Sequence, residues 1–162
     1  MKIGILSDTH DHADAAAAAV RMLRQAGAEG LIHCGDVGSP AILDELAGQP
    51  AAFVWGNTDL DRMALQRYAQ HLGIECFGAW GELRWGGKRI AVLHGDDIKL
   101  RQKLLAEQEF DYLLHGHTHV KTDQRFGRTR LINPGALYRA ATRTVALLET
   151  GADRLKFLTV VP

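Results

Sequence analysis

Cysteines are scarce in this sequence, and no apolar run is long enough to cross a membrane. The two cysteines, Cys34 and Cys76, lie far apart and belong to no close-spaced motif, which excludes a disulfide framework. A membrane-spanning helix needs ~20 consecutive apolar residues, and no run approaches that length. The apolar N-terminal segment reaches Ser7 and Asp8 too soon for a signal peptide. We therefore expect a cytoplasmic protein with two reduced cysteines.

A net charge is also lacking, and the charged residues form no long block of one sign. Lys and Arg together number 19, and so do Asp and Glu. A chain with this balance has no general attraction for nucleic acid, so no extended nucleic-acid surface is expected. The 162 residues contain no repeat, linker or low-complexity tail, which predicts one domain over residues 1–162. The sequence leaves open whether this domain forms a homo-oligomer.

The first two thirds of the chain alternate short apolar segments with helical segments. Strands are predicted at 3–6, 31–34 and 52–55, and helices at 13–26, 41–47 and 62–71. This alternation favours a mostly parallel sheet covered by helices.

The remainder of the chain is richer in strands. We predict a hairpin over 81–94 around Gly86-Gly87, a helix over 98–109, a strand over 112–114, and two further β-rich segments over 121–132 and 144–161. No long helix fits after Glu109. The fold class expected is α/β (α+β), with two sheets packed face to face and helices outside.

Side chains that commonly bind metals follow five of the predicted strands, and four of these groups stand beside a glycine. They are Asp8, His10, Asp36, Asn57, His94, His117 and His119. Ligands of open α/β sheets bind at the carboxyl ends of the strands, so these side chains are expected to converge. Two pairs have i, i+2 spacing, Asp8/His10 and His117/His119. Such a pair shares one side only on an extended segment, so extended segments are predicted at both.

The chemistry of this set indicates a dinuclear metal centre. Oxygen and imidazole ligands suit Mn, Fe, Zn, Co or Ni better than Ca or Mg. The absence of cysteine ligands argues against a structural zinc site. Seven ligands exceed the needs of one tetrahedral ion and fit two ions that share a carboxylate. Each residue alone is equally well explained as a turn residue or a satisfied polar group; the combination of all seven favours the metal centre.

Other polar residues have weaker claims. His12 either faces the same cleft or belongs to an exposed loop, and His115 either joins the site or lies hydrogen-bonded beneath it. His33 and His71 are interpreted as ordinary strand and helix residues. Three carboxylates are candidates to orient ligand imidazoles through their free N–H groups, namely Asp59, Asp96 and Asp97.

Together these motifs resemble the signature of the calcineurin-like metallophosphoesterases. The resemblance rests on Asp8-Thr9-His10, Gly35-Asp36, Gly56-Asn57, His94-Gly95 and Gly116-His117-Thr118-His119, and on a closing turn at Asn133-Pro134-Gly135. The short length resembles the small prokaryotic phosphodiesterase branch of the family. The resemblance implies a β-sandwich flanked by helices in four layers.

It also implies a role for each ligand. The first ion would take Asp8, His10 and His119, and the second Asn57, His94 and His117. Asp36 would bridge both ions, and Asp36, Asn57 and His94 would lie nearest the chemistry. The chain departs from the family at Thr58, where many members have a histidine that can protonate the leaving group. A milder departure is Ala136, where the closing turn often has a serine.

The activity implied is hydrolysis of a small phosphoester, with nucleotides as one candidate class, by in-line attack of a hydroxide that bridges two divalent ions. Manganese is expected first among them, with Ni, Fe, Zn, Co or Mg as alternatives. Two divalent ions bring four positive charges, and the two aspartates with a hydroxide remove three. A singly charged phosphodiester then balances the site, whereas a monoester requires a further cation, for which Lys99, Arg101 and Arg139 are candidates.

Two other functions are weighed against this phosphodiesterase. A phosphomonoesterase of the same fold is one. A non-catalytic metal-binding scaffold like the retromer subunit of this superfamily is the other, although a scaffold predicts eroded ligands and every ligand type is present here. The absence of a histidine at Thr58 favours substrates whose leaving group needs little proton assistance, and so again favours phosphodiesters.

Overall fold

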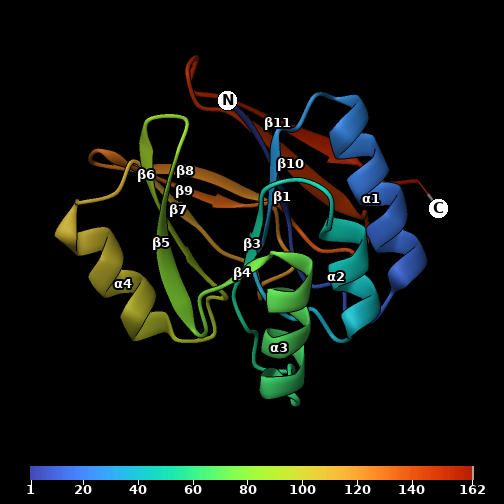
Figure 1. Ribbon diagram of the computed structural model, residues 1–162. Coiled ribbons are helices and arrows are strands. Elements are labelled where there is room, and N and C mark those ends of the chain that lie inside the picture. The colour runs from blue at the N-terminus through green and yellow to red at the C-terminus, as the bar shows by residue number, and fades with distance from the viewer. Residues whose placement is uncertain (162) are drawn as a thin grey trace.

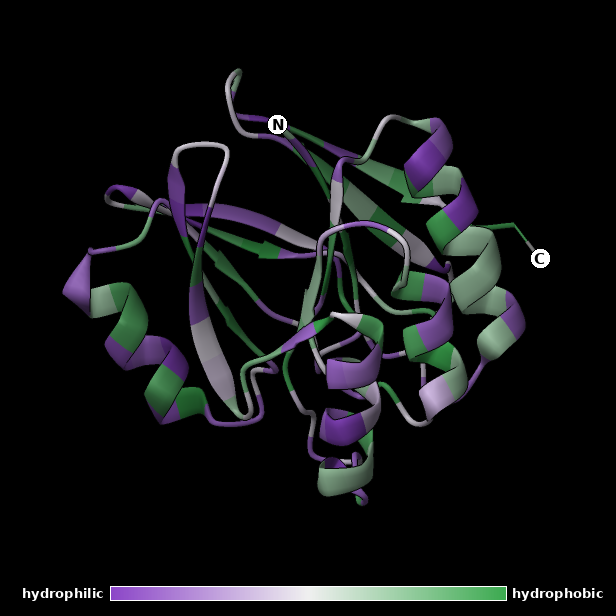
Figure 2. Ribbon diagram, in the orientation of Figure 1, coloured by the Kyte–Doolittle hydropathy of each residue, from purple (hydrophilic) through white to green (hydrophobic). Residues whose placement is uncertain are grey.

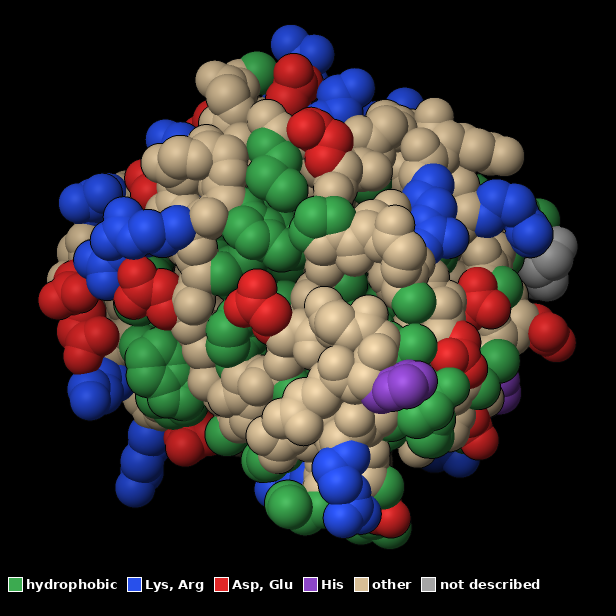
Figure 3. All heavy atoms as spheres, viewed as in Figure 1, with side chains coloured by type: hydrophobic (Ala, Val, Ile, Leu, Met, Phe, Trp, Pro, Cys, Tyr) green, Lys and Arg blue, Asp and Glu red, His purple; other side chains and the backbone are tan. Residues whose placement is uncertain are grey.

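Two β-sheets pack face to face between layers of helices in the computed structural model, which describes residues 1–161 (Figure 1). The apolar cluster between the sheets joins Ile3 and Ile5 of the first sheet to Val92 and Leu114 of the second. Acidic and basic side chains are interspersed over the face shown in Figure 3, without a large patch of one sign.

The first sheet has six strands in the order β11-β10-β1-β2-β3-β4. They are β1 (Lys2–Leu6), β2 (Gly30–His33), β3 (Ala51–Phe53), β4 (Glu75–Cys76), β10 (Thr144–Glu149) and β11 (Arg154–Thr159). β1 to β4 run parallel, and β10 pairs antiparallel with both β1 and β11. The carboxyl ends of the central strands therefore meet at one edge.

The second sheet has five strands in the order β5-β6-β7-β9-β8. They are β5 (Trp80–Trp85), β6 (Lys88–Leu93), β7 (Tyr112–Leu114), β8 (Thr122–Phe126) and β9 (Thr129–Asn133). β6, β7 and β9 are parallel, while β5 and β8 are antiparallel edge strands. The central strands of this sheet thus also end at a common edge.

Helices cover the outer face of each sheet (Figure 1). Helices α1 (Ala13–Gln25), α2 (Pro40–Leu46) and α3 (Arg62–Leu72) pack on the first sheet, and α4 (Ile98–Glu107) packs on the second. Apolar segments alternate with polar ones along these helices (Figure 2). In α1 the buried residues Ala16, Ala19, Val20 and Leu23 recur every three or four positions, as an amphipathic helix requires.

The central strand β1 is apolar on both faces because both are covered. Ile3 and Ile5 enter the cluster between the sheets, and Leu6 enters the cluster beneath the helices. Gly4 brings α1 close to the sheet, since a Cβ there would lie 2.9 Å from Leu23 Cδ1.

The predicted fold class is confirmed: two sheets form a sandwich with helices outside. The predicted helices and strands appear within about two residues of their expected bounds. β4 was missed, because a two-residue strand has no periodicity to detect. Within residues 1–161, no helix is both long and apolar enough to span a membrane.

Candidate metal centre

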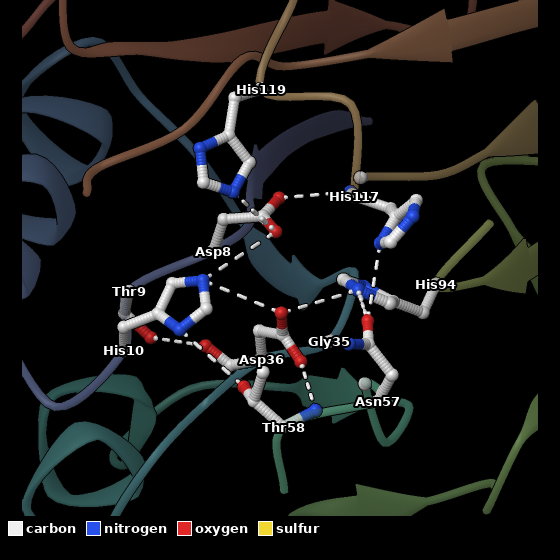
Figure 4. Close-up of polar contacts among 12 residues, drawn as sticks. Asp8, Thr9, His10, Gly35, Asp36, Asn57, Thr58, His94, His117 and His119 are labelled. Atoms are coloured by element: carbon white, nitrogen blue, oxygen red, sulfur yellow. Dashed lines mark hydrogen bonds and ion pairs between the residues drawn. The ribbon is translucent and has the colours of Figure 1, made fainter. Parts of the chain in front are cut away.

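The seven predicted ligands come together where the carboxyl ends of the two sheets meet (Figure 4). Asp8 and His10 follow β1, Asp36 follows β2, Asn57 follows β3, His94 follows β6, and His117 and His119 follow β7. Both sheets contribute, so neither one alone would make the site.

Asp36 stands between two imidazole groups. Its Oδ2 lies 3.3 Å from His10 Nε2 and 3.3 Å from His94 Nε2. Its Oδ1 accepts a hydrogen bond from the Thr58 N–H at 2.9 Å. One carboxylate oxygen therefore faces both halves of the site, while the other is held by the backbone.

The remaining ligands fall into two groups on either side of Asp36. On one side, Asp8 Oδ1 lies 3.2 Å from His119 Nε2 and 4.0 Å from His10 Nε2. On the other, Asn57 Oδ1 lies 3.0 Å from His94 Nε2 and 3.1 Å from His117 Nδ1. The two groups match the division that the family resemblance implies.

The donor atoms fit divalent ions. Asp8 Oδ1 and His10 Nε2 are buried without a hydrogen-bond partner. A buried polar atom left unpaired costs about 1–3 kcal/mol, so it requires a reason. The ligand atoms of Asp8, His10 and His119 all lie within 4.8 Å of one another, as do those of Asp8, Asp36 and His94. Carboxylate oxygen and imidazole nitrogen at such spacing can share a metal ion.

The electrostatics keep Asp36 ionised. Burial alone would raise its pKa, but hydrogen bonds with His94 and the Thr58 N–H outweigh burial and hold the pKa well below its usual range. At Asp8, burial dominates and raises the pKa. Burial also lowers the pKa of His10, against the pull of the two carboxylates. The carboxylate between the two groups is thus the one with the depressed pKa.

The prediction of extended segments at the two i, i+2 pairs is wrong. Asp8 and His10 have φ of +55° and +44°, and His117 and His119 have φ of +67° and +58°, all in the left-handed region. Asp36 joins them with φ of +55°. A non-glycine residue pays roughly 1–2 kcal/mol for this conformation. The loops curl back on each other instead of extending, and strain of this kind is typical of functional sites.

Two glycines beside the predicted ligands are required because a side chain would not fit there, and not because of a positive φ. A Cβ on Gly56 would lie 2.0 Å from Asp36 Oδ1, and a Cβ on Gly116 would lie 2.6 Å from Asp8 Oδ2. Contacts that short do not occur for real Cβ atoms, so these positions exclude any side chain. The glycines next to the ligands therefore let the backbone of one loop approach the carboxylate of another.

The imidazole of His94 is oriented by the backbone. Its Nδ1–H donates to the Cys34 carbonyl at 2.8 Å, which directs Nε2 toward Asp36 Oδ2 at 3.3 Å. Within residues 1–161, none of the three carboxylates expected to orient an imidazole of the site, Asp59, Asp96 and Asp97, makes that contact. Asp59 instead accepts hydrogen bonds from the Val37, Gly38 and Gly56 N–H groups. Asp97 caps α4, and Asp96 is exposed.

His33 is the last residue of β2, in agreement with its interpretation as a strand residue, but its ring also makes hydrogen bonds that the sequence did not reveal. Its ring is fully buried, and its Nδ1 accepts a hydrogen bond from the Gly35 N–H at 3.2 Å. Its Nε2 therefore carries the proton and donates to Thr9 Oγ1 at 2.9 Å, and the Thr9 hydroxyl donates to the Val37 carbonyl. Burial lowers the pKa of His33 to about 3. These hydrogen bonds connect the loop after β1 to the loop after β2. A histidine at the end of an apolar strand was the only signal for them.

The other histidines lie outside the ligand set. His115 is buried and hydrogen-bonded to the Gly116 carbonyl at 3.0 Å, as the second of its two interpretations expected. Burial lowers its pKa to about 4. His12 is exposed and stacks on Tyr138 with the ring centroids 4.6 Å apart. His71 is an exposed residue near the end of α3.

An open cleft of about 190 Å³ lies over the ligands. It is lined by His10, Asp36, Asn57, Thr58, His117, His119, Tyr138 and Arg139. The Thr58 hydroxyl lies 3.4 Å from His10 Nδ1. The position that carries a histidine in many family members therefore does face the site, but here it holds no group that titrates near neutral pH.

The profile of the calcineurin-like phosphoesterase superfamily domain matches residues 1–153. The chain belongs to this superfamily. Its members depend on divalent metals, and the ligand groups described above agree with that dependence.

Individual relatives align over nearly the whole chain. The phosphodiesterase MJ0936 of Methanocaldococcus jannaschii is 27% identical, and the alignment covers 93% of each protein. The "probable metallophosphoesterase" of Methanothermobacter thermautotrophicus is 30% identical over 96% of this chain and 89% of the relative. The solved structure of an archaeal phosphodiesterase superposes with a TM-score of 0.91 at 24% identity, covering 98% of this chain and 99% of that one. The sequence similarity therefore extends over most of each relative, and the fold is shared with the archaeal phosphodiesterase.

Proposed function

We propose that this protein is a dinuclear-metal phosphodiesterase that acts on small phosphoesters, with nucleotides as the preferred class. The observation that carries the proposal is Asp36 Oδ2, which lies 3.3 Å from an imidazole nitrogen of each ligand group. The first ion is assigned to Asp8, His10 and His119, and the second to Asn57, His94 and His117. Asp36 is assigned to both ions.

When bound, two divalent ions supply Lewis-acid chemistry: they lower the pKa of water and offset negative charge on phosphoryl oxygens. The chain's own residues hold these positions rigidly. The Cys34 carbonyl fixes the His94 ring, and the His117 N–H donates to Asp8 Oδ2 at 3.1 Å. Such preorganisation means that little rearrangement is needed during reaction.

The choice of a diester over a monoester rests on charge and on proton supply. With a hydroxide nucleophile counted, two divalent ions and two carboxylates carry one net positive charge, which a singly charged diester balances and a dianionic monoester exceeds. Thr58 at the mouth of the cleft cannot protonate a leaving alkoxide. A sequence match over 93% of each protein and a solved structure that superposes with a TM-score of 0.91 are both named as phosphodiesterases, which supports the same choice.

The finer assignments follow from the same reasoning. Manganese is the first candidate ion, because it accepts both oxygen and imidazole ligands. A cytoplasmic location is supported by the two free cysteines, Cys34 and Cys76. We also propose that residues 1–162 act as one domain.

A scaffold without activity is disfavoured by seven complete ligands at a site with buried, unpaired donor atoms.

Metal removal and a substrate panel test the proposal. Protein stripped with a chelator should lose hydrolysis of bis(p-nitrophenyl) phosphate and regain it with Mn²⁺. The same protein should hydrolyse p-nitrophenyl phosphate more slowly. His71→Ala, which changes an exposed residue on α3, serves as the matched histidine control and should behave as wild type. Undiminished hydrolysis in metal-free protein would rule out the proposed mechanism, and a faster monoester reaction would rule out the substrate class.

A further inference from the structure

One basic side chain, that of Arg139, lines the cleft over the ligands. It lies in the loop between β9 and β10, next to Tyr138. The two other cations considered from the sequence, Lys99 and Arg101, lie on α4. Arg101 lines a different groove, together with Leu131. Of the three candidates, the fold brings only Arg139 to the site.

The Arg139 backbone is held in an unfavourable conformation. Its φ is +46°, in the left-handed region that glycine adopts freely and other residues avoid. The side chain is exposed. Arg89 and Arg130 each form ion pairs with two carboxylates, whereas the Arg139 guanidinium forms none with residues 1–161. A strained arginine with an unpaired charge at a cleft indicates a ligand rather than a role in folding.

The neighbouring ring holds this guanidinium in place. The Arg139 Cζ lies 5.0 Å from the centroid of the Tyr138 ring, a cation–π distance. That ring stacks on His12 and lies 4.9 Å from the His10 ring. The guanidinium is therefore within about 10 Å of the His10 imidazole, through a single fixed aromatic ring.

We propose that Arg139 binds a second anionic group of the substrate, separate from the phosphoryl group that reacts. This inference rests on the proposed phosphodiesterase function. A singly charged diester already balances the metal centre, so the positive charge of Arg139 remains available. The planar guanidinium matches a phosphate through two parallel hydrogen bonds. Neighbouring phosphates of a nucleotide lie closer together than about 10 Å, which is the limit given above for the separation of the Arg139 guanidinium and the His10 imidazole. The favoured substrates are therefore nucleotide diesters that carry an additional phosphate.

A pair of chromogenic substrates tests this. Thymidine 5′-(p-nitrophenyl phosphate) and its 3′-phosphorylated form share the reacting diester and the leaving group, and differ only in the second anion. Wild type should prefer the 3′-phosphorylated form by about 10-fold in kcat/KM, as one charge-assisted contact provides. Arg139→Ala and Arg139→Gly should lose most of this preference, and Arg139→Lys should keep part of it. Lys99→Ala and Arg101→Ala are the matched controls and should retain it.

A binding measurement gives a readout independent of turnover. Calorimetry should show thymidine 3′,5′-bisphosphate binding more tightly than thymidine 5′-phosphate to wild type, with the difference reduced in Arg139→Gly. Because glycine suits a φ of +46°, this variant should melt no lower than wild type, which separates lost binding from misfolding.

Four results would overturn the inference. If wild type hydrolyses both thymidine substrates equally, or if Arg139→Ala keeps the preference, the second anion is not bound there, and the phosphodiesterase proposal stands. If Arg139→Ala slows both diesters and p-nitrophenyl phosphate by one common factor, Arg139 contacts the reacting phosphoryl group instead. If metal-loaded wild type hydrolyses no diester at all, the proposed function fails, and the inference fails with it.

Discussion

Replacing Asp36 by asparagine tests the bridging role most directly. The substitution keeps the size of the side chain and an oxygen that can accept from the Thr58 N–H at 2.9 Å. It turns an amide N–H toward imidazole nitrogens that lie 3.3 Å away on both sides. One charge-assisted contact contributes about 1.5–3 kcal/mol, so each ion should bind roughly 10- to 100-fold more weakly. Turnover should nearly vanish.

The variant should nevertheless fold. Asparagine tolerates the left-handed φ of +55° at this position. The hydrogen bonds that depress the Asp36 pKa also stabilise the fold, so metal-free Asp36→Asn should melt somewhat below metal-free wild type. The test is therefore the rise in Tm that metal causes within each protein. An ion at 100 times its Kd stabilises wild type by about 2.7 kcal/mol, which raises Tm by about 5–10 °C in a chain of this size.

The assay combines thermal unfolding with and without Mn²⁺ and elemental analysis after dialysis against a fixed Mn²⁺ concentration. Wild type should hold two ions per chain and show the rise in Tm, and Asp36→Asn should show neither. Asp44→Asn is the matched control, because Asp44 is an exposed carboxylate on α2 that accepts a hydrogen bond from Tyr68. Two tightly held ions and a wild-type rise in Tm for Asp36→Asn would refute the bridging assignment.

Two further predictions concern residues around the ligands. Thr58→His restores a titratable group beside His10 and should flatten the dependence of kcat/KM on leaving-group pKa, with up to about 10²-fold gains for poor leaving groups. A wild-type series that is already flat would mean that another residue protonates the leaving group. His33 has a folded pKa of about 3 against an unfolded pKa near 6.5, so the folded state binds fewer protons between those values. Its stabilising contribution is complete above pH 6.5 and is lost as the pH falls toward 3. In urea unfolding of metal-free protein, wild type should therefore lose up to about 2 kcal/mol more than His33→Gln between pH 6.5 and pH 5. Equal losses would show that the His33 ring is not buried in the neutral form.

Much of the architecture follows from local patterns along the chain. Apolar segments such as 31–34, the alanine-rich helix and the Gly86-Gly87 turn each predict an element without knowledge of its neighbours. The structure moves their bounds by only about two residues, since periodicity and turn residues act over a few positions. β4 lies beyond such reasoning, because the pairing of Glu75–Cys76 with β3 provides its only definition.

The candidate metal site shows the same division. The seven residues proposed as ligands can be named from the sequence, because each follows an apolar strand and most stand beside a glycine. Their backbone conformation is not evident, because the residues of the pairs Asp8/His10 and His117/His119, predicted as extended, have φ values in the left-handed region. Two residues of one loop cannot reveal that the loop must curl to meet a carboxylate from another strand.

The sequence by itself determined the elements, the family and the chemical types at the site. Only the tertiary structure decided that Asp59 holds backbone amides instead of imidazoles, that His33 braces Thr9, and that Arg139 faces the cleft while Arg101 does not. The physical reason is the separation along the sequence of the residues that interact. Helices, strands and turns depend on neighbours a few positions away, whereas these contacts join loops 20 or more residues apart, and the order of strands in two packed sheets brings them together.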